Sequence, residues 1–195
     1  MYGGMYKQLT SIHYKLFLFI HNLVPTDAFT QLGHKGGYNY SKLVFDHCFK
    51  SYKDFIYNVT LDGSMLVYLN LYLSKKETPD ENYAREVQEL FTVGKRPFAK
   101  FTEKDVREVA RALVGWRHDY DKIVYEEGHE NIPVFEPWNH DTGDKQFSSF
   151  YGNKIIKGKE GDAGAEELQE VIDMLFETEG VIQVKYTNQA FFRLI

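Results

Sequence analysis

Apolar and aromatic side chains recur every three or four residues along most of this chain, and no other feature restricts its fold so strongly. Residues at that spacing share one face of an α-helix, so each run predicts a helix with one buried face. Such runs fill residues 6–73, and another fills 165–177. We therefore expect a mainly α-helical chain, helical over about 5–116 and again over 163–195. The stretch 25–40, with a proline and three glycines, is expected to be a loop.

Two of the expected helices carry explicit signals for where they begin and end. In the stretch TPDENYAREVQELFTVG, Thr78 and Glu81 are spaced as a capping box, and Gly94 is placed to end the helix. Further along, Thr102 and Asp105 are spaced as a second capping box. We expect both segments to form helices with well-defined ends.

The sequence changes character between residues 120 and 156. Short β-prone pieces alternate there with Gly, Asn and Asp: KIVY (122–125), IPVF (132–135), FSSFY (147–151) and KII (154–156). We expect one or two small β-hairpins, or an ordered loop, laid against the helices. We interpret residues 1–195 as a single domain and as part of a longer protein.

Composition excludes several classes of function. The net charge is −5 and no basic stripe is present, so the chain would repel a phosphate backbone and nucleic acid is not an expected partner. The single cysteine, Cys48, excludes an intrachain disulfide and supports no thiolate zinc site. No apolar run reaches the length of about 20 residues that a membrane-spanning helix needs. The common hydrolase, zinc-protease and nucleotide-binding motifs do not occur.

The helix expected at 79–93 carries an unusual polar stripe. At about 100° per residue, Asn82, Arg85, Glu86 and Glu89 fall on one side of the helix, away from its apolar side. One interpretation is a solvated outer face. The other is that Glu86 and Glu89 face a second layer of protein and form a carboxylate pair that could hold a divalent metal or move a proton.

Two further features are candidates for a site. The segment PWNHDTGDK places His140, Asp141 and Lys145 around Gly143, either as a functional loop or as a turn held by Asx-type hydrogen bonds. His21 lies beside the apolar face of the first expected helix. A lone histidine in that position is either a core histidine or the edge of a site.

The order of three segments resembles a known family. PDENYAREVQELFTVG, FTEKDVREVARALVGW and FEPWNHDTGDKQF are similar, in that order, to the pattern of the bacterial family catalogued as domain of unknown function 1800. Upstream, KLFLFIHNLVPT is similar to the family's K-M-x-x-F-W-H-N-H-F-x-T. There Ile20 replaces a tryptophan and Leu23 replaces the second histidine, so only His21 and Asn22 of that motif remain.

The resemblance implies a mainly helical fold and turns the polar stripe inward, with His140, Asp141 and Lys145 over it and His21 at its edge. It also implies export to the periplasm or cell surface, although the chain shows no signal peptide. Family genes often lie beside those of a sulfatase-like or phosphatase-like companion, which is therefore an expected partner, as is a glycan.

Two functions follow as hypotheses. The first is a metal-assisted hydrolase acting on a glycan or on a sulfate- or phosphate-bearing substrate. Its catalytic residues would be Glu86, Glu89, His140 and Asp141, its binding residues Asn82, Arg85, Lys145 and Trp116, and its metal ligands His21, Glu86, Glu89 and His140. The second is a helical scaffold or binding module in which the same residues form a polar network. We favour the scaffold, because one histidine of the family pattern is missing and no complete nucleophile–base set is visible.

Overall fold

The computed structural model describes residues 11–95, 97, 99–119 and 133–178. Helices dominate this part of the chain, so the prediction of a mainly α-helical fold with a small β-hairpin region is confirmed. The α-helices are α1 (Ser11–Leu23), α2 (Ala28–His47), α3 (Tyr52–Thr60), α4 (Gly63–Tyr68), α5 (Asn82–Glu86), α6 (Glu103–Leu113) and α8 (Glu167–Glu177). Among the described helices, none is long and apolar enough to cross a membrane.

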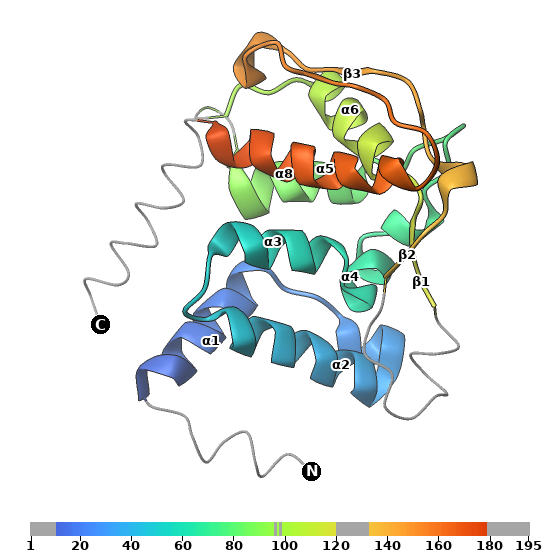
Figure 1. Cartoon of the computed structure of the whole chain (residues 1–195). Coiled ribbons are helices and arrows are strands. Elements are labelled where there is room, and N and C mark those ends of the chain that lie inside the picture. The colour runs from blue at the N-terminus through green and yellow to red at the C-terminus, as the bar shows by residue number, and fades with distance from the viewer. Residues whose placement is uncertain (1–10, 96, 98, 120–132, 179–195) are drawn as a thin grey trace.

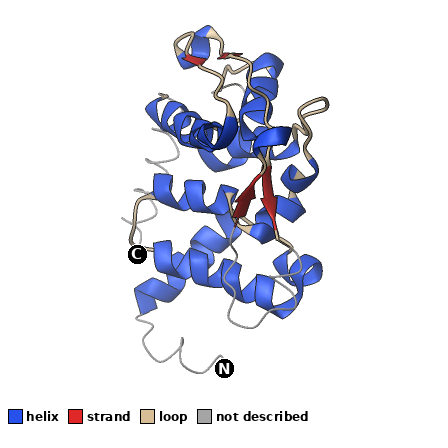
Figure 2. Cartoon of the chain, turned by 45° about the vertical axis from the view of Figure 1, so that its right-hand side comes forward, coloured by secondary structure: helices blue, strands red, loops and turns tan. Residues whose placement is uncertain are grey.

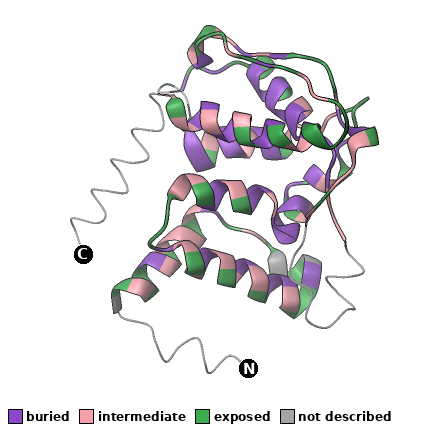
Figure 3. Ribbon diagram, in the orientation of Figure 1, coloured by how far each residue is buried: buried purple, intermediate pink, exposed green. Residues whose placement is uncertain are grey.

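The helices are arranged in three levels, as Figure 1 shows. α1 and α2 pack together at one end, α3 and α4 lie in the middle, and α5, α6 and α8 form the other end. α2 packs on α4, and α3 packs on α8, so the middle level joins the two ends. The buried residues concentrate where these levels meet, while the outer turns of α2 are mostly exposed or half-buried (Figure 3).

The core is rich in aromatic rings, and its tyrosine hydroxyls have partners. Tyr83 on α5 is fully buried, and its hydroxyl lies 2.6 Å from Thr60 Oγ1 at the end of α3. The Tyr40 hydroxyl donates to the Val24 carbonyl, which ties α2 to the end of α1. These bonds satisfy the polar end of each ring, which is what allows a core with so many tyrosines.

The prediction of a loop over residues 25–40 is wrong, because helix α2 includes most of these residues. The helix breaks at Leu32 and Gly33, where Gly33 has φ = 62°, and then continues. Gly36 and Gly37 are buried, and Ser64 Oγ on α4 donates to the Gly36 carbonyl at 3.3 Å. Gly36 therefore lies against α4, while Gly37 leaves room for the Phe29 ring of the same helix, and neither marks a turn.

The expected helix at 79–93 starts three residues late. α5 begins at Asn82, whose backbone N–H donates to Asp80 Oδ1 at 2.8 Å, and Glu81 makes no capping bond. The helix then widens into a π-helix over Val87–Thr92 and ends before Gly94, which has φ = 95°. The second capping box is confirmed: the Thr102 and Asp105 side chains each bond the other's backbone N–H at the start of α6.

Two short antiparallel strand pairs lie beside the helices (Figure 2). β1 (Trp116–His118) pairs with β2 (Pro133–Phe135), with Trp116 opposite Phe135. β3 (Lys145–Gln146) pairs with β4 (Ile155–Ile156). The expected strand at 147–151 is instead a 3₁₀ turn over Ser149–Tyr151. The piece KIVY lies outside the described residues.

Candidate functional site

His140 is held in the interior by both nitrogens of its ring. It follows a 3₁₀ turn over Pro137–Asn139 and is almost fully buried. Its Nδ1 lies 2.7 Å from the Val114 carbonyl oxygen, just after α6, and its Nε2 lies 3.0 Å from Glu167 Oε1. The Phe135 ring packs against the imidazole at a centroid distance of 5.3 Å. These contacts fix both the position and the orientation of the ring.

Glu167, the first residue of α8, is the centre of this arrangement. Its carboxylate is completely buried and lies 2.6 Å from Lys145 Nζ through Oε2. Oε1 also accepts the Lys159 backbone N–H at 2.8 Å. Lys145 in turn donates to the Asp141 carbonyl. We call His140, Lys145 and Glu167 the Glu167 cluster.

His140 and Lys145 meet at one buried carboxyl group. The two ring nitrogens of His140 face the Val114 carbonyl oxygen and Glu167 Oε1, and Lys145 Nζ faces Glu167 Oε2. Such a group of charges is stable in an apolar interior only when its members are paired and hydrogen-bonded to one another.

A second ion pair fixes the neighbouring part of the segment. Arg111 on α6 binds the Asp141 carboxylate through two bonds, Nε–Oδ2 at 2.7 Å and Nη2–Oδ1 at 3.0 Å. The Gly143 N–H also donates to Asp141 Oδ1 at 2.8 Å. Burial alone would raise the pKa of Asp141, but the bonds from Arg111 and Gly143 outweigh it and lower that pKa below its ordinary value. Asp141 therefore holds the segment to α6 as an anion.

Three further hydrogen bonds attach the rest of this region. The Asp105 carboxylate, fully buried at the start of α6, accepts the Ser148 N–H and hydroxyl at 2.7 Å each. The Tyr151 hydroxyl donates to Gln88 Oε1 in the π-helix at 2.8 Å. Residues 137–158 are thus fastened to α6, to α8 and to the π-helix. We call residues 137–158 the anchored segment.

The polar stripe of α5 is partly solvated and does not meet the Glu167 cluster. Asn82 is exposed, and Arg85 Nη2 lies 2.7 Å from Glu103 at the start of α6, a bond that raises the pKa of Arg85. Glu89 lies 3.7 Å from Lys95. Glu86 Oε2 is buried and has no hydrogen-bond partner among the described residues. Neither Glu86 nor Glu89 forms a hydrogen bond or ion pair with His140, Asp141 or Lys145, all of which are described.

The structure also places His21 far from this stripe. His21 is half-buried on α1, where its ring contacts Phe17 and Tyr40, and burial lowers its pKa. α1 lies at the opposite end of the molecule from α8 (Figure 1). The Trp116 ring packs on Phe135 at 5.1 Å. Within the described ranges, no group of three or more His, Cys, Asp or Glu side chains is placed to hold a metal ion. The ligand set His21, Glu86, Glu89 and His140 is therefore not brought together.

Sequence reasoning missed two residues that organise the site, Glu167 and Arg111. Glu167 had a visible signal, because it lies four residues before Val171 and therefore on the buried face of its helix. A charged residue there needs a buried partner. Arg111 had no comparable signal, since its partner Asp141 lies 30 residues away along the chain.

The family model described as "Protein of unknown function (DUF1800)" matches residues 2–184. No curated protein and no solved structure matches the chain.

Proposed function

The chain belongs to the DUF1800 family, and we propose that it is a helical binding module whose buried polar network holds the anchored segment rigid for a partner protein. The partner that we propose is the sulfatase-like or phosphatase-like companion implied by the family resemblance. The compartment that we propose is the periplasm or the cell surface.

The observation that carries this proposal is the burial of the Glu167 cluster. The side chains of His140, Lys145 and Glu167 are 1%, 0% and 0% exposed. A catalytic acid or base must come within hydrogen-bond reach of its substrate, and none of these groups can do so while the segment is in place. These side chains instead bind each other and backbone carbonyl groups. This is the arrangement expected of a structural network.

The anchored segment also presents a large aromatic side chain to solvent. Trp138 is 70% exposed, although it lies next to the buried residue Asn139. Asn139 Nδ2 donates to the Ser74 carbonyl at 3.1 Å, and Lys76 Nζ donates to the Trp138 carbonyl at 3.0 Å. The backbone that carries the indole is thus held by two hydrogen bonds with residues 74–76. A fixed, exposed tryptophan is typical of the residues that dominate binding at protein interfaces.

Co-purification tests the role of Trp138. The full chain would be co-expressed with its tagged sulfatase-like companion, as wild type, as Trp138→Ala and as Ile155→Ala. Ile155 is the matched control, because it is 46% exposed on β4 of the same segment. We expect Trp138→Ala to weaken the affinity for the companion at least tenfold, which corresponds to about 1.4 kcal/mol. Ile155→Ala should leave the affinity unchanged. Equal binding by all three proteins would refute the proposal. Binding of glycans alone, reduced by Trp138→Ala, would assign the surface to a glycan.

One observation favours a metal-assisted hydrolase as the second candidate. Glu86 Oε2 is a buried carboxylate oxygen without a hydrogen-bond partner among the described residues, and such a group costs free energy unless something binds it. Calorimetric titration of the chain with Zn²⁺, Mn²⁺ and Ca²⁺, repeated with Glu86→Gln, tests this candidate. Binding heat that the substitution abolishes would support it, and absence of heat with all three ions would remove it.

A further inference from the structure

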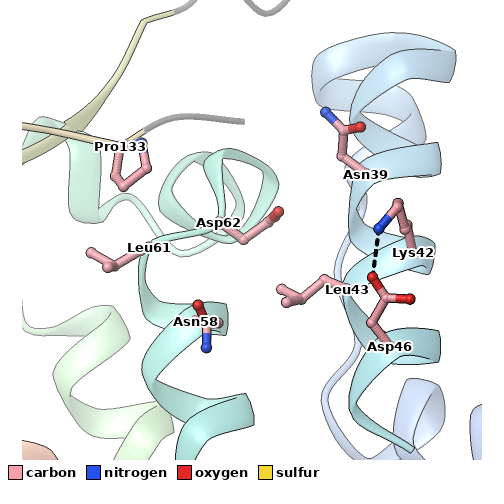
Figure 4. A pocket seen from close by; sticks show the side chains of 8 residues that line it. All are labelled: Asn39, Lys42, Leu43, Asp46, Asn58, Leu61, Asp62 and Pro133. Atoms are coloured by element: carbon pink, nitrogen blue, oxygen red, sulfur yellow. Dashed lines mark hydrogen bonds and ion pairs between the residues drawn. The ribbon is translucent and has the colours of Figure 1, made fainter. Parts of the chain in front are cut away.

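An apolar groove lies between α1, the end of α2 and the start of α3. Its volume is about 90 Å³, well below the range of about 300–1,000 Å³ for small-molecule sites, so it suits one or two side chains. The larger pocket between α2 and the junction of α3 with α4 is different, because the charged side chains of Lys42, Asp46 and Asp62 line it (Figure 4). The groove shares no lining residue with the Glu167 cluster or the anchored segment, so its occupant is a question apart from the proposed function.

The lining presents mainly hydrocarbon to the groove. Leu16 of α1 forms part of it, and Lys50 adds a charge that is exposed. Three polar side chains in the lining bind backbone carbonyl groups: the Tyr52 hydroxyl donates at 2.8 Å, the Cys48 thiol donates at 3.3 Å, and His47 Nδ1 lies 2.8 Å from its carbonyl oxygen. Because these polar atoms already have partners, an occupant of the groove gains most from apolar contact.

The helix α1 that forms one wall is apolar but poorly covered. Of its described side chains, only Leu16 is fully buried. Ile20 and Leu23, which line the groove, are half-buried, and Leu18 is exposed. A segment that removed this apolar surface from water would gain about 25 cal/mol per Å².

The helix α8 ends beside the same groove. It ends at Glu177, and the Phe176 ring in its last turn lies 6.0 Å from the ring of Tyr52, which also lines the groove. Residues 179–195 therefore continue the chain from a point next to the groove wall. As a helix, this segment would be longer than α1, which has 13 residues.

The sequence of this segment suits an apolar groove. In VIQVKYTNQAFFRLI (181–195), Phe191, Leu194 and Ile195 are spaced i, i+3 and i+4, so they share one face of a helix. Phe192 falls about 100° away from Phe191 and off that face. A segment tethered so close to the groove has an effective concentration on the order of millimolar, which favours it over a separate partner of equal affinity.

We propose that this groove is the docking site of residues 184–195 of the same chain. The face formed by Phe191, Leu194 and Ile195 packs against Ile20 and Leu23 of α1. Docked in this way, the segment ties the α8 end of the molecule directly to α1, in addition to the connection that α3 and α4 provide.

NMR on the full chain tests the contact directly. In a sample with labelled Ile and Leu methyl groups and labelled Phe rings, we expect nuclear Overhauser effects between the Phe191 ring and the methyl groups of Ile20 or Leu23. A second sample mixes methyl-labelled chains with ring-labelled chains, so that only contacts between chains give a signal. A signal in the mixed sample would assign the groove to a second copy of the chain and overturn the proposal. Absence of the signal from the first sample would overturn it as well.

Cys48 gives an independent measurement, because it lines the groove and is the single cysteine of the chain. Its rate of alkylation by iodoacetamide would be followed by mass spectrometry in the wild type, in Phe191→Ser and in Phe192→Ser. We expect Phe191→Ser to undock the segment and to raise the rate about fivefold or more. Phe192→Ser, the control of the same residue type, should keep the wild-type rate, and Leu194→Ser provides a second test on the docked face. A rate for Phe191→Ser and Leu194→Ser no higher than that for Phe192→Ser would refute the proposal.

Discussion

At the scale of single residues, the buried Glu167 carboxylate joins α8 to His140, to Lys145 and to the Lys159 backbone. Glu167→Gln keeps the size of the side chain but removes the charge that faces Lys145, 2.6 Å away, and His140. Removing one partner of a buried ion pair costs about 3–5 kcal/mol, because the other charge stays buried and unpaired. We expect Glu167→Gln to lower the free energy of unfolding by that amount, as measured by urea denaturation.

The preceding residue provides the control. The Glu166 side chain is 69% exposed and lies 2.8 Å from Lys159. An exposed ion pair of this kind contributes at most about 1 kcal/mol, so Glu166→Gln should change stability little. If both substitutions had the same effect, the Glu167 cluster would not be the anchor that the contacts indicate.

At the scale of elements, the π-helix is the part of the fold that receives the anchored segment. Gln88 is fully buried, and its Oε1 accepts from the Tyr151 hydroxyl at 2.8 Å, while its Nε2 donates to the Ala84 carbonyl at 2.7 Å. Tyr151→Phe leaves Gln88 Oε1 buried without a donor, which costs about 1–3 kcal/mol. We expect a loss of stability in that range, with faster amide hydrogen exchange in residues 147–156.

Tyr68→Phe is the matched change for this element. Tyr68 is partly exposed at the end of α4 and forms no hydrogen bond among the described residues. Its substitution should therefore alter stability by no more than about 0.5 kcal/mol. Unchanged exchange in the anchored segment of Tyr151→Phe would mean that the segment does not depend on the π-helix.

At the scale of the whole molecule, ion pairs between elements should make the fold sensitive to acid. Burial alone would raise the pKa values of Asp141 and Asp173, but bonds from Arg111 and from Lys53 outweigh it and lower both below the ordinary 3.8. A carboxylate whose pKa is lower in the folded chain binds fewer protons than in the unfolded chain. Its contribution is therefore present above about pH 3.8 and is lost as the pH falls through the folded value. We expect the urea midpoint to fall steeply below about pH 4.

Two substitutions identify the source of that acid sensitivity. Asp173 joins α8 to Lys53 on α3 at 2.6 Å, so Asp173→Asn should flatten the pH dependence and reduce stability at pH 7. Asp162→Asn is the control, since Asp162 is exposed and makes no ion pair in the described part of the chain. An equally steep fall in both variants would place the sensitivity in other groups.

Local interactions explain what could be predicted. The capping box of Thr102 and Asp105 closes within four residues, and the apolar periods of α1, α3 and α8 are short-range patterns. The prediction failed where one segment packs closely on another. Gly36 and Gly37 look like a loop in isolation, but both lie within α2, where Gly36 contacts Ser64 of α4 and Gly37 leaves room for the Phe29 ring. The chain was expected to be helical up to Trp116, but Trp116 begins strand β1. Its partner strand β2 begins only at Pro133, so the pairing is not visible in the local sequence.

The candidate site shows the same division. The sequence by itself determined the helical class and placed His140, Asp141, Gly143 and Lys145 in one short stretch. Only the tertiary structure decided that this stretch meets Glu167 on α8 and Arg111 on α6, and not Glu86 on α5 or Glu89 in the π-helix. The physical reason is the distance along the chain over which each interaction acts. Periodicity and capping act over a few residues, whereas the partner of a buried charge depends on which helices pack against each other.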